Sequence, residues 1–85
     1  VLRLIRMVVG AARPEDVWVG VCGGIAGDPE GALILSGLGV DELSMSIPAV
    51  AAVKARLRNV SMADARRLAE RALACSTAAD VRALL

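Results

Sequence analysis

Apolar residues recur at helical spacing over the first twelve positions of the chain. Five of them fall on one helical face, namely Leu2, Ile5, Val8, Val9 and Ala12. The arginines Arg3, Arg6 and Arg13 fall on the opposite face, where we expect them to be solvated. Pro14 cannot continue a regular helix. The pattern therefore predicts an amphipathic helix over residues 1–12.

Two short runs with strand character follow, separated by a helical segment. Val17–Cys22 is rich in β-branched residues and bounded by glycines, and Glu42–Ser46 is a second short run. Between them Asp28 can cap a helix and Pro29 suits its first position, with an end near Ser36. A strand–helix–strand crossover of this length predicts parallel strands in a right-handed unit.

The last part of the chain predicts three helices. Pro48 begins the first, in which Val50, Val53 and Leu57 share a face. Residues 61–64 and residues 77–80 each place a hydroxyl three positions before an aspartate, as in a capping box, and the final helix should end at Leu85. Two parallel strands do not make a stable sheet alone, and such sheets need both faces covered. Residues 1–85 thus predict a single partial domain of a larger α/β barrel or doubly wound sheet.

Composition narrows the possible functions. The 85 residues are 56% hydrophobic with a net charge of +1, and the basic cluster at residues 54–71 lies far from Trp18, the only aromatic residue. Nucleic-acid binding is therefore disfavoured. No apolar run approaches the roughly 18 residues of a membrane span, and the first residues lack a signal-peptide pattern, so we expect a cytoplasmic protein. Histidine is absent, which excludes histidine-based acid–base chemistry from this segment.

Cys22 is the residue best placed for chemistry. It is the last residue of the first predicted strand, and Gly23 and Gly24 follow it. Active sites of α/β barrels and open α/β sheets lie at the carboxyl ends of the strands. A thiol is mostly protonated at neutral pH, so it can donate a proton. From the residues alone, the alternative is that Cys22 is a small buried hydrophobe.

Two ordered motifs carry a resemblance. Gly-Val-Cys-Gly-Gly-Ile-Ala-Gly-Asp at residues 20–28, followed by Gly-Leu-Gly-Val-Asp-Glu-Leu-Ser-Met-Ser at residues 37–46, resembles the C-terminal domain of Enzyme I. That family is the phosphoenolpyruvate–protein phosphotransferase of bacterial sugar phosphotransferase systems. The likeness extends into the closing helices. It implies that this chain is the C-terminal fragment of a (β/α)₈ TIM barrel with two short parallel strands and flanking helices.

The resemblance also implies chemistry and partners. In that family the phosphoryl group passes from phosphoenolpyruvate to a histidine on a separate domain, and the cysteine then protonates the enolate to give pyruvate. Cys22 falls on that cysteine, with Gly23 and Gly24 as substrate-binding residues. The resemblance further implies Mg²⁺, with ligands outside this chain, a phosphocarrier protein reached through the N-terminal domain, and a homodimeric full-length parent.

One departure from the family pattern keeps alternatives open. The family has glutamate two positions after the cysteine, where this chain has Gly24. One alternative is a fragment of a pyruvate phosphate dikinase-like enzyme, and another is a degenerate, non-catalytic remnant that acts as an assembly module. We expect the isolated chain to be inactive. Ser44 or Ser46 could line the pocket, whereas Asp41 and Glu42 are interpreted as turn residues.

Overall fold

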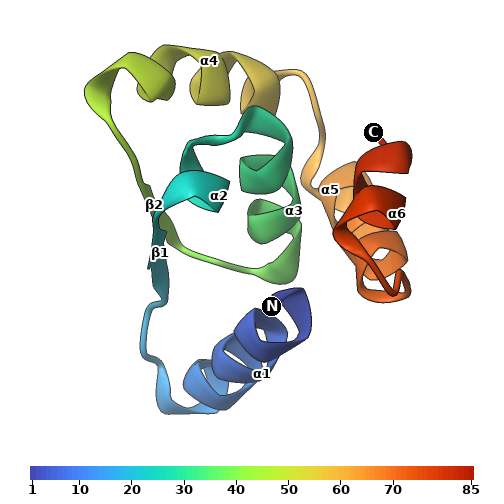
Figure 1. Cartoon of the computed structure of the whole chain (residues 1–85). Coiled ribbons are helices and arrows are strands. Elements are labelled where there is room, and N and C mark those ends of the chain that lie inside the picture. The colour runs from blue at the N-terminus through green and yellow to red at the C-terminus, as the bar shows by residue number, and fades with distance from the viewer.

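The computed structural model describes all 85 residues (Figure 1). Its elements in chain order are α1 (Leu2–Ala12), the short 3₁₀ helix η1 (Arg13–Glu15), β1 (Gly20–Cys22), α2 (Gly24–Gly27), α3 (Pro29–Leu38), β2 (Glu42–Ser44), α4 (Ile47–Arg58), α5 (Met62–Leu73) and α6 (Ala78–Ala83). The predicted order of two strands among helices is confirmed, with two short helical turns added.

The two strands form a parallel pair joined through α3. Gly20 lies beside Glu42, Val21 beside Leu43, and Cys22 beside Ser44. Val21 and Leu43 turn toward the helices and pack against the core, whereas their neighbours along each strand are exposed. Figure 1 shows the strands at one edge of the molecule, with helices on one side of the sheet only. The other face of the sheet is therefore uncovered.

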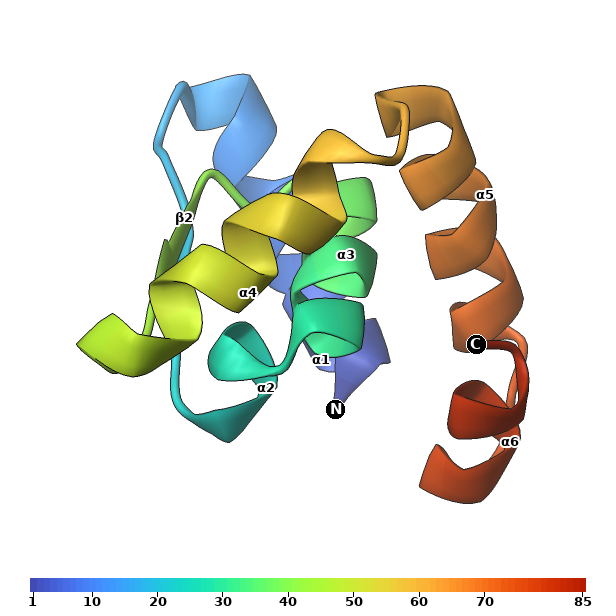
Figure 2. The ribbon, with the colours of Figure 1, turned by 90° about the horizontal axis from the view of Figure 1, so that it is seen from above.

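Helix α3 is the centre of the fold. Figure 2 shows it between α4 and α5, with α1 behind it, and it contacts all three. Its buried residues are Gly31, Ala32, Leu33, Ile34, Leu35 and Leu38. Because α3 is apolar nearly all round, it can be covered on several sides at once. Small residues on α5, among them Ala65 and Ala69, allow the two helices to approach closely.

The predicted helix starts are confirmed by side-chain caps. The Asp28 carboxylate accepts from the Gly31 amide at 3.3 Å, which satisfies one of the free donors at the start of α3. Ser61 and Thr77 cap α5 and α6 in the same way, each at 3.1 Å. Gly39, with a φ of 97°, ends α3 in the left-handed conformation that glycine adopts without strain.

Several boundaries differ from the prediction. Val17 and Trp18 lie outside the three-residue strand β1. Val19 also lies outside β1, and its carbonyl accepts from the amides of Asp41 and Glu42 at the point where the pairing of β1 with β2 begins. The glycine-rich turn contains helix α2, because Ala26 is fully buried and its amide bonds the Gly23 carbonyl at 3.2 Å. Apolar packing there overrides the low helix propensity of glycine. The chain also leaves β2 at Ser44 rather than Ser46, and α6 ends at Ala83.

Three predicted packing assignments were wrong. Val8 and Val50 were expected on packed helix faces, but they are 56% and 39% exposed. Met62, also expected to pack, is exposed as well. Of the other residues on the predicted α1 face, Val9 is buried, and Leu2 and Ile5 pack against the core. The apolar face of α1 is thus wider than the part of it that the other helices of this chain cover.

Arg3 and Arg6 of α1 and Arg13 of η1 were predicted to be a solvated face, and this prediction was incomplete. Arg6 forms an ion pair with Glu70 of α5 at 2.5 Å. Arg3 donates to the Leu73 carbonyl at 3.3 Å, near the end of the same helix, where cations are favoured. Arg13 bonds the Gly39 carbonyl and pairs with Asp41 at 3.3 Å. These side chains remain partly exposed. They nevertheless connect α1 with α5, and η1 with the turn before β2.

Candidate active site

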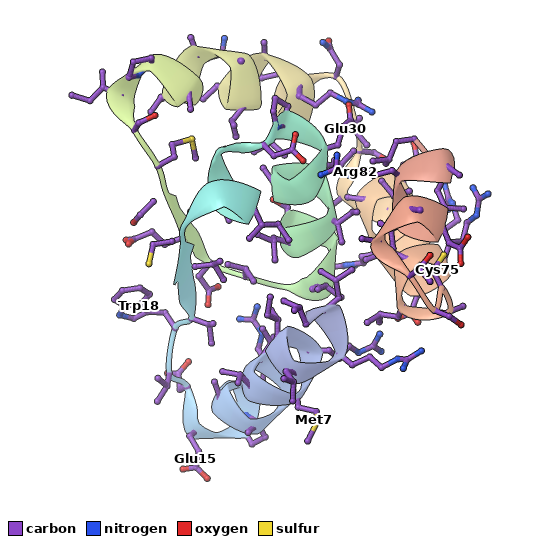
Figure 3. The ribbon with its side chains drawn as sticks, viewed as in Figure 1. Met7, Glu15, Trp18, Glu30, Cys75 and Arg82 are labelled. Carbon is purple, nitrogen blue, oxygen red and sulfur yellow. The ribbon has the colours of Figure 1, made fainter.

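The uncovered face of the sheet carries the polar and reactive side chains of both strands. We define the inner face as Trp18, Gly20, Cys22, Glu42 and Ser44, all of which are exposed. In Figure 3 the Trp18 side chain points away from the helices, on the open side of the sheet. Strand alternation places Gly20 and Cys22 on the same side as Trp18. Residues distant in sequence thus gather on one surface.

Cys22 is an exposed, free thiol at the carboxyl end of β1. Ser44 lies beside it in the parallel register, at the carboxyl end of β2. Neighbouring strands lie roughly 4.8 Å apart, so these two side chains stand next to each other on the inner face. The alternative of a buried hydrophobic cysteine is therefore not what this structure contains.

Gly23 shapes the turn after the thiol. Its φ of 105° and ψ of −173° lie in a region that is essentially restricted to glycine. This conformation turns the chain sharply from β1 into α2, so Cys22 stands at an abrupt end of the strand. Gly24 begins α2, and a Cβ at that position would meet nothing within 4 Å. The turn thus requires a glycine at position 23 and has room for a side chain at position 24.

Glu42 reaches along β2 toward Ser44. The Ser44 hydroxyl lies 3.5 Å from Oε1 of Glu42, as a donor to that carboxylate. A Cβ on Gly20 would lie 2.9 Å from Cζ3 of Trp18 and 3.7 Å from the same Glu42 oxygen. The missing side chain at Gly20 therefore leaves space that the indole and the carboxylate share. Sequence reasoning had Glu42 as a turn residue, although its alternation with Ser44 could have placed both on one face.

Asp41, by contrast, serves the scaffold. Its carboxylate accepts from the Val19 amide at 2.9 Å and pairs with Arg13 at 3.3 Å. The backbone hydrogen bond from Val19 is the main cause that lowers the pKa of Asp41; desolvation opposes it, and the charge and hydrogen bond of Arg13 lower the pKa further. Ser46, the other predicted pocket residue, lies beyond β2 at the start of α4 and makes no side-chain cap bond.

The residues present do not fit a magnesium site. No three acidic, cysteine or histidine side chains gather where they could hold a metal ion. Asp28 caps α3 and Asp41 is bound to Val19 and Arg13, which leaves Glu42 as an isolated carboxylate on the inner face. Octahedral Mg²⁺ requires more oxygen ligands than one carboxylate supplies.

A cavity of about 590 Å³ lies elsewhere, between the start of α1, the start of α3 and the loop before α6. Ile25, Ile34 and Val81 are among its lining residues, and Cys22 is not. The thiol thus lies on an open surface, outside this cavity. None of the helices combines the length and apolar character needed to cross a membrane.

Comparison with known families identifies the class of protein. Residues 1–62 match the family described as PEP-utilising enzyme, PEP-binding domain. The chain belongs to this family of phosphoenolpyruvate-utilising enzymes. The domain is a TIM barrel, of which this chain contains two short parallel strands and their helices. The inner face is the side of the sheet that faces away from the helices, as the interior of such a barrel does.

Particular relatives narrow the position within the family. The chain is 67% identical over 84 residues to a multiphosphoryl transfer protein of Rhodobacter capsulatus, covering 99% of this chain and 10% of that protein. It is 53% identical over 85 residues to a phosphoenolpyruvate-protein phosphotransferase of Haloferax volcanii, covering 100% of this chain and 15% of that protein. The Haemophilus influenzae phosphoenolpyruvate-protein phosphotransferase is 45% identical with the same coverage. The chain therefore spans only about a tenth to a seventh of these relatives.

Proposed function

We propose that this chain is the part of a sugar phosphotransferase system Enzyme I-type protein that supplies the proton donor, Cys22. The observation that carries the proposal is the position of the thiol. Cys22 is exposed at the carboxyl end of a parallel strand, on the face opposite the helices. In TIM barrels this is the end at which active sites are built. The names of the relatives favour this protein type over a pyruvate phosphate dikinase-like enzyme.

The proposed step is proton transfer to carbon. After the phosphoryl group has moved to a histidine on another domain, enolpyruvate remains in the barrel as its enolate. The S–H bond of Cys22 breaks, its proton forms a new C–H bond at the methylene carbon, and the electron pair stays on sulfur as thiolate. The enolate becomes pyruvate, and the thiolate regains a proton from water. A fixed acid is needed because carbon is a poor proton acceptor that must be approached from one face.

The glycine turn supports this role in two ways. Gly23 ends the strand abruptly after Cys22. A Cβ built at position 23 or at position 24 would meet nothing within 4 Å, so the space around the turn is open. Backbone and substrate can therefore approach closely at this point. We assign substrate contact to the two glycines. Mg²⁺, the acceptor histidine, the phosphocarrier partner and the contacts of a homodimer would all belong to the rest of the full-length protein.

The test uses a chimera, because the 67% identity allows a segment exchange. The matched 84 residues of the Rhodobacter capsulatus protein are replaced by this chain, and pyruvate formation from phosphoenolpyruvate is measured. We expect Cys22→Ala to lower turnover by about 10²-fold or more, the usual contribution of a positioned acid. Cys75→Ala is the matched control, because Cys75 lies after α5, away from the inner face, and its thiol donates only to the Arg71 carbonyl. Unchanged turnover in Cys22→Ala would disprove the proton-donor role.

A non-catalytic remnant is the rival that this chimera also addresses. Gly24, in place of the family's glutamate, is the observation that favours the remnant. A chimera that binds phosphoenolpyruvate but forms no pyruvate, while the unmodified Rhodobacter capsulatus protein does, would support the remnant over the enzyme.

A further inference from the structure

We propose that the cavity of about 590 Å³ between α1, the start of α3 and α6 is a second binding site, for a small anion with an apolar body such as a medium-chain carboxylate. This inference goes beyond the function proposed above and does not depend on the role of Cys22. Ten of the seventeen lining residues are hydrophobic. Small-molecule sites typically have roughly 300–1,000 Å³ of space, an apolar lining and a few polar groups.

The apolar part of the cavity is built by three helices. Ile25 of α2 and Ile34 of α3 form one side, and α6 forms the other. The residues that α6 contributes lie at positions 78, 81, 82 and 85, which is the spacing of a single helical face. No residue of α6 is buried. Its apolar face therefore stands apart from α3 and leaves space that an apolar ligand can fill.

Arg3 supplies a fixed positive charge at the α1 side of the cavity. Its Nε and Nη2 atoms both donate to the Leu73 carbonyl at 3.3 Å, and Nη2 also lies 3.5 Å from the Cys75 carbonyl oxygen. These contacts hold the guanidinium at the end of α5. Nη1 forms none of them and remains free to donate to a ligand.

Arg82 supplies a second positive charge, from the opposite side. It lies in the last turn of α6, lines the cavity and forms no ion pair with another residue. Asp28 is the acidic residue of the lining, and its carboxylate already accepts from the Gly31 amide. Two arginines against one aspartate give the lining an excess of positive charge. Because guanidinium groups bind carboxylates with strong, charge-assisted hydrogen bonds, an anionic head group is favoured.

The cavity lies behind the glycine turn and apart from the inner face. Gly24 and Ile25 belong to the lining and to α2, the helix that follows Gly23, whereas Cys22 is not in the lining. A ligand in the cavity would contact the turn from the side opposite the thiol. Its binding should therefore not compete with phosphoenolpyruvate.

Octanoate is the probe for this site, titrated into the chimera by isothermal calorimetry. Three compounds serve as matched controls: octan-1-ol lacks the charge, octylammonium reverses it, and acetate lacks the apolar chain. We expect octanoate to bind at least about tenfold more tightly than each of them, because the site requires both charge and chain. Saturating phosphoenolpyruvate should leave its affinity unchanged.

Variants of α6 show where the probe binds. Ala78→Leu should abolish octanoate binding by filling the cavity, whereas Ala79→Leu should not, because Ala79 is exposed and outside the lining. Arg82→Gln should weaken binding about tenfold, through the loss of a charged hydrogen-bond donor. Arg66→Gln is its control, since Arg66 is an exposed arginine of α5 outside the lining.

Four outcomes would overturn the site. They are equal affinities for octanoate and octan-1-ol, octanoate binding that survives Ala78→Leu, octanoate binding that is equally strong in Arg82→Gln, and displacement of octanoate by phosphoenolpyruvate. A chimera that binds no octanoate at all would also overturn it, because the rest of the full-length protein would then fill the cavity. None of these results bears on the proton-donor role, which the turnover of Cys22→Ala tests separately.

Discussion

Gly37 of α3 lies against the backbone of Ala65 in α5, so closely that a Cβ at position 37 would overlap the Ala65 carbonyl oxygen. The same Cβ would lie 3.0 Å from that of Ala69. The sequence pattern predicted a helix end near Ser36, but α3 continues to Leu38, and Gly37 lies inside it at the crossing with α5. The contact between these two helices depends on the absence of one side chain.

Gly37→Ala is expected to destabilise the domain, since overpacking against backbone cannot be relieved by a change of rotamer. The expected loss is about 1–3 kcal/mol in the free energy of unfolding, measured by urea denaturation of the chimera. Gly10→Ala is the matched control, because Gly10 is also helical and nothing lies within 4 Å of a Cβ there. That substitution should stabilise by about 0.5–1 kcal/mol. Equal effects of the two changes would contradict the close crossing.

The Asp41 contacts predict a stability that depends on pH. The pKa of Asp41 is lowered from 3.8, first by the hydrogen bond from the Val19 amide and further by Arg13. A carboxyl group with a lowered pKa contributes stability above its unfolded value, and loses it as the pH falls through the folded value. Asp41→Asn should therefore reduce the loss of stability below about pH 4, measured as urea midpoints from pH 5 downward.

Asp16→Asn provides the control for this pH effect. The Asp16 carboxylate accepts no side-chain hydrogen bond, and its φ of 56° is one that asparagine tolerates. Its acid profile should follow that of the parent. If the urea midpoints of Asp41→Asn fell with pH in the same way as those of the parent, the Val19 and Arg13 contacts would contribute nothing to acid stability.

The sequence predicted the main elements well because their signals are local. Asp28, Ser61 and Thr77 all cap the helices that the pattern assigned to them. Contacts between residues that are distant in sequence were not predicted. The packing of Gly37 on Ala65 and the joining of Arg13 to Asp41 depend on how distant elements meet, which periodicity does not encode.

In the candidate site, too, local features were predictable from the sequence and long-range contacts were not. The place of Cys22 at a strand end was predictable, because strand alternation and flanking glycines are local features. The shared face of Glu42 and Ser44 followed from alternation along one strand, whereas the position of Glu42 beside Gly20 depends on the register between the two strands. Val8 was wrongly placed in the core for a related reason, since the helix pattern gives a face but not what covers it.

Trp18 offers a direct measure of whether the inner face is covered. It is the only aromatic residue of the chain and is 65% exposed. In the isolated chain its fluorescence should resemble that of a solvated indole and be readily quenched by iodide. In the chimera, where further strands close the barrel, a Trp18 probe in a background without other tryptophans should emit at shorter wavelength and resist quenching. Identical spectra in both settings would show that the inner face does not become a barrel interior.

Gly24→Glu tests the departure from the family pattern most directly. Position 24 is exposed, starts α2 and has open space around a Cβ, so the glutamate fits without displacing its neighbours. A carboxylate in the first turn of a helix is also favoured by the helix dipole. We expect pyruvate formation in the chimera to rise several-fold, because the added carboxylate can orient groups beside the thiol. Gly24→Ala separates this from simple stiffening of the turn and should leave the rate near that of the parent. If both variants matched the parent, the glycine at position 24 would not reduce the rate.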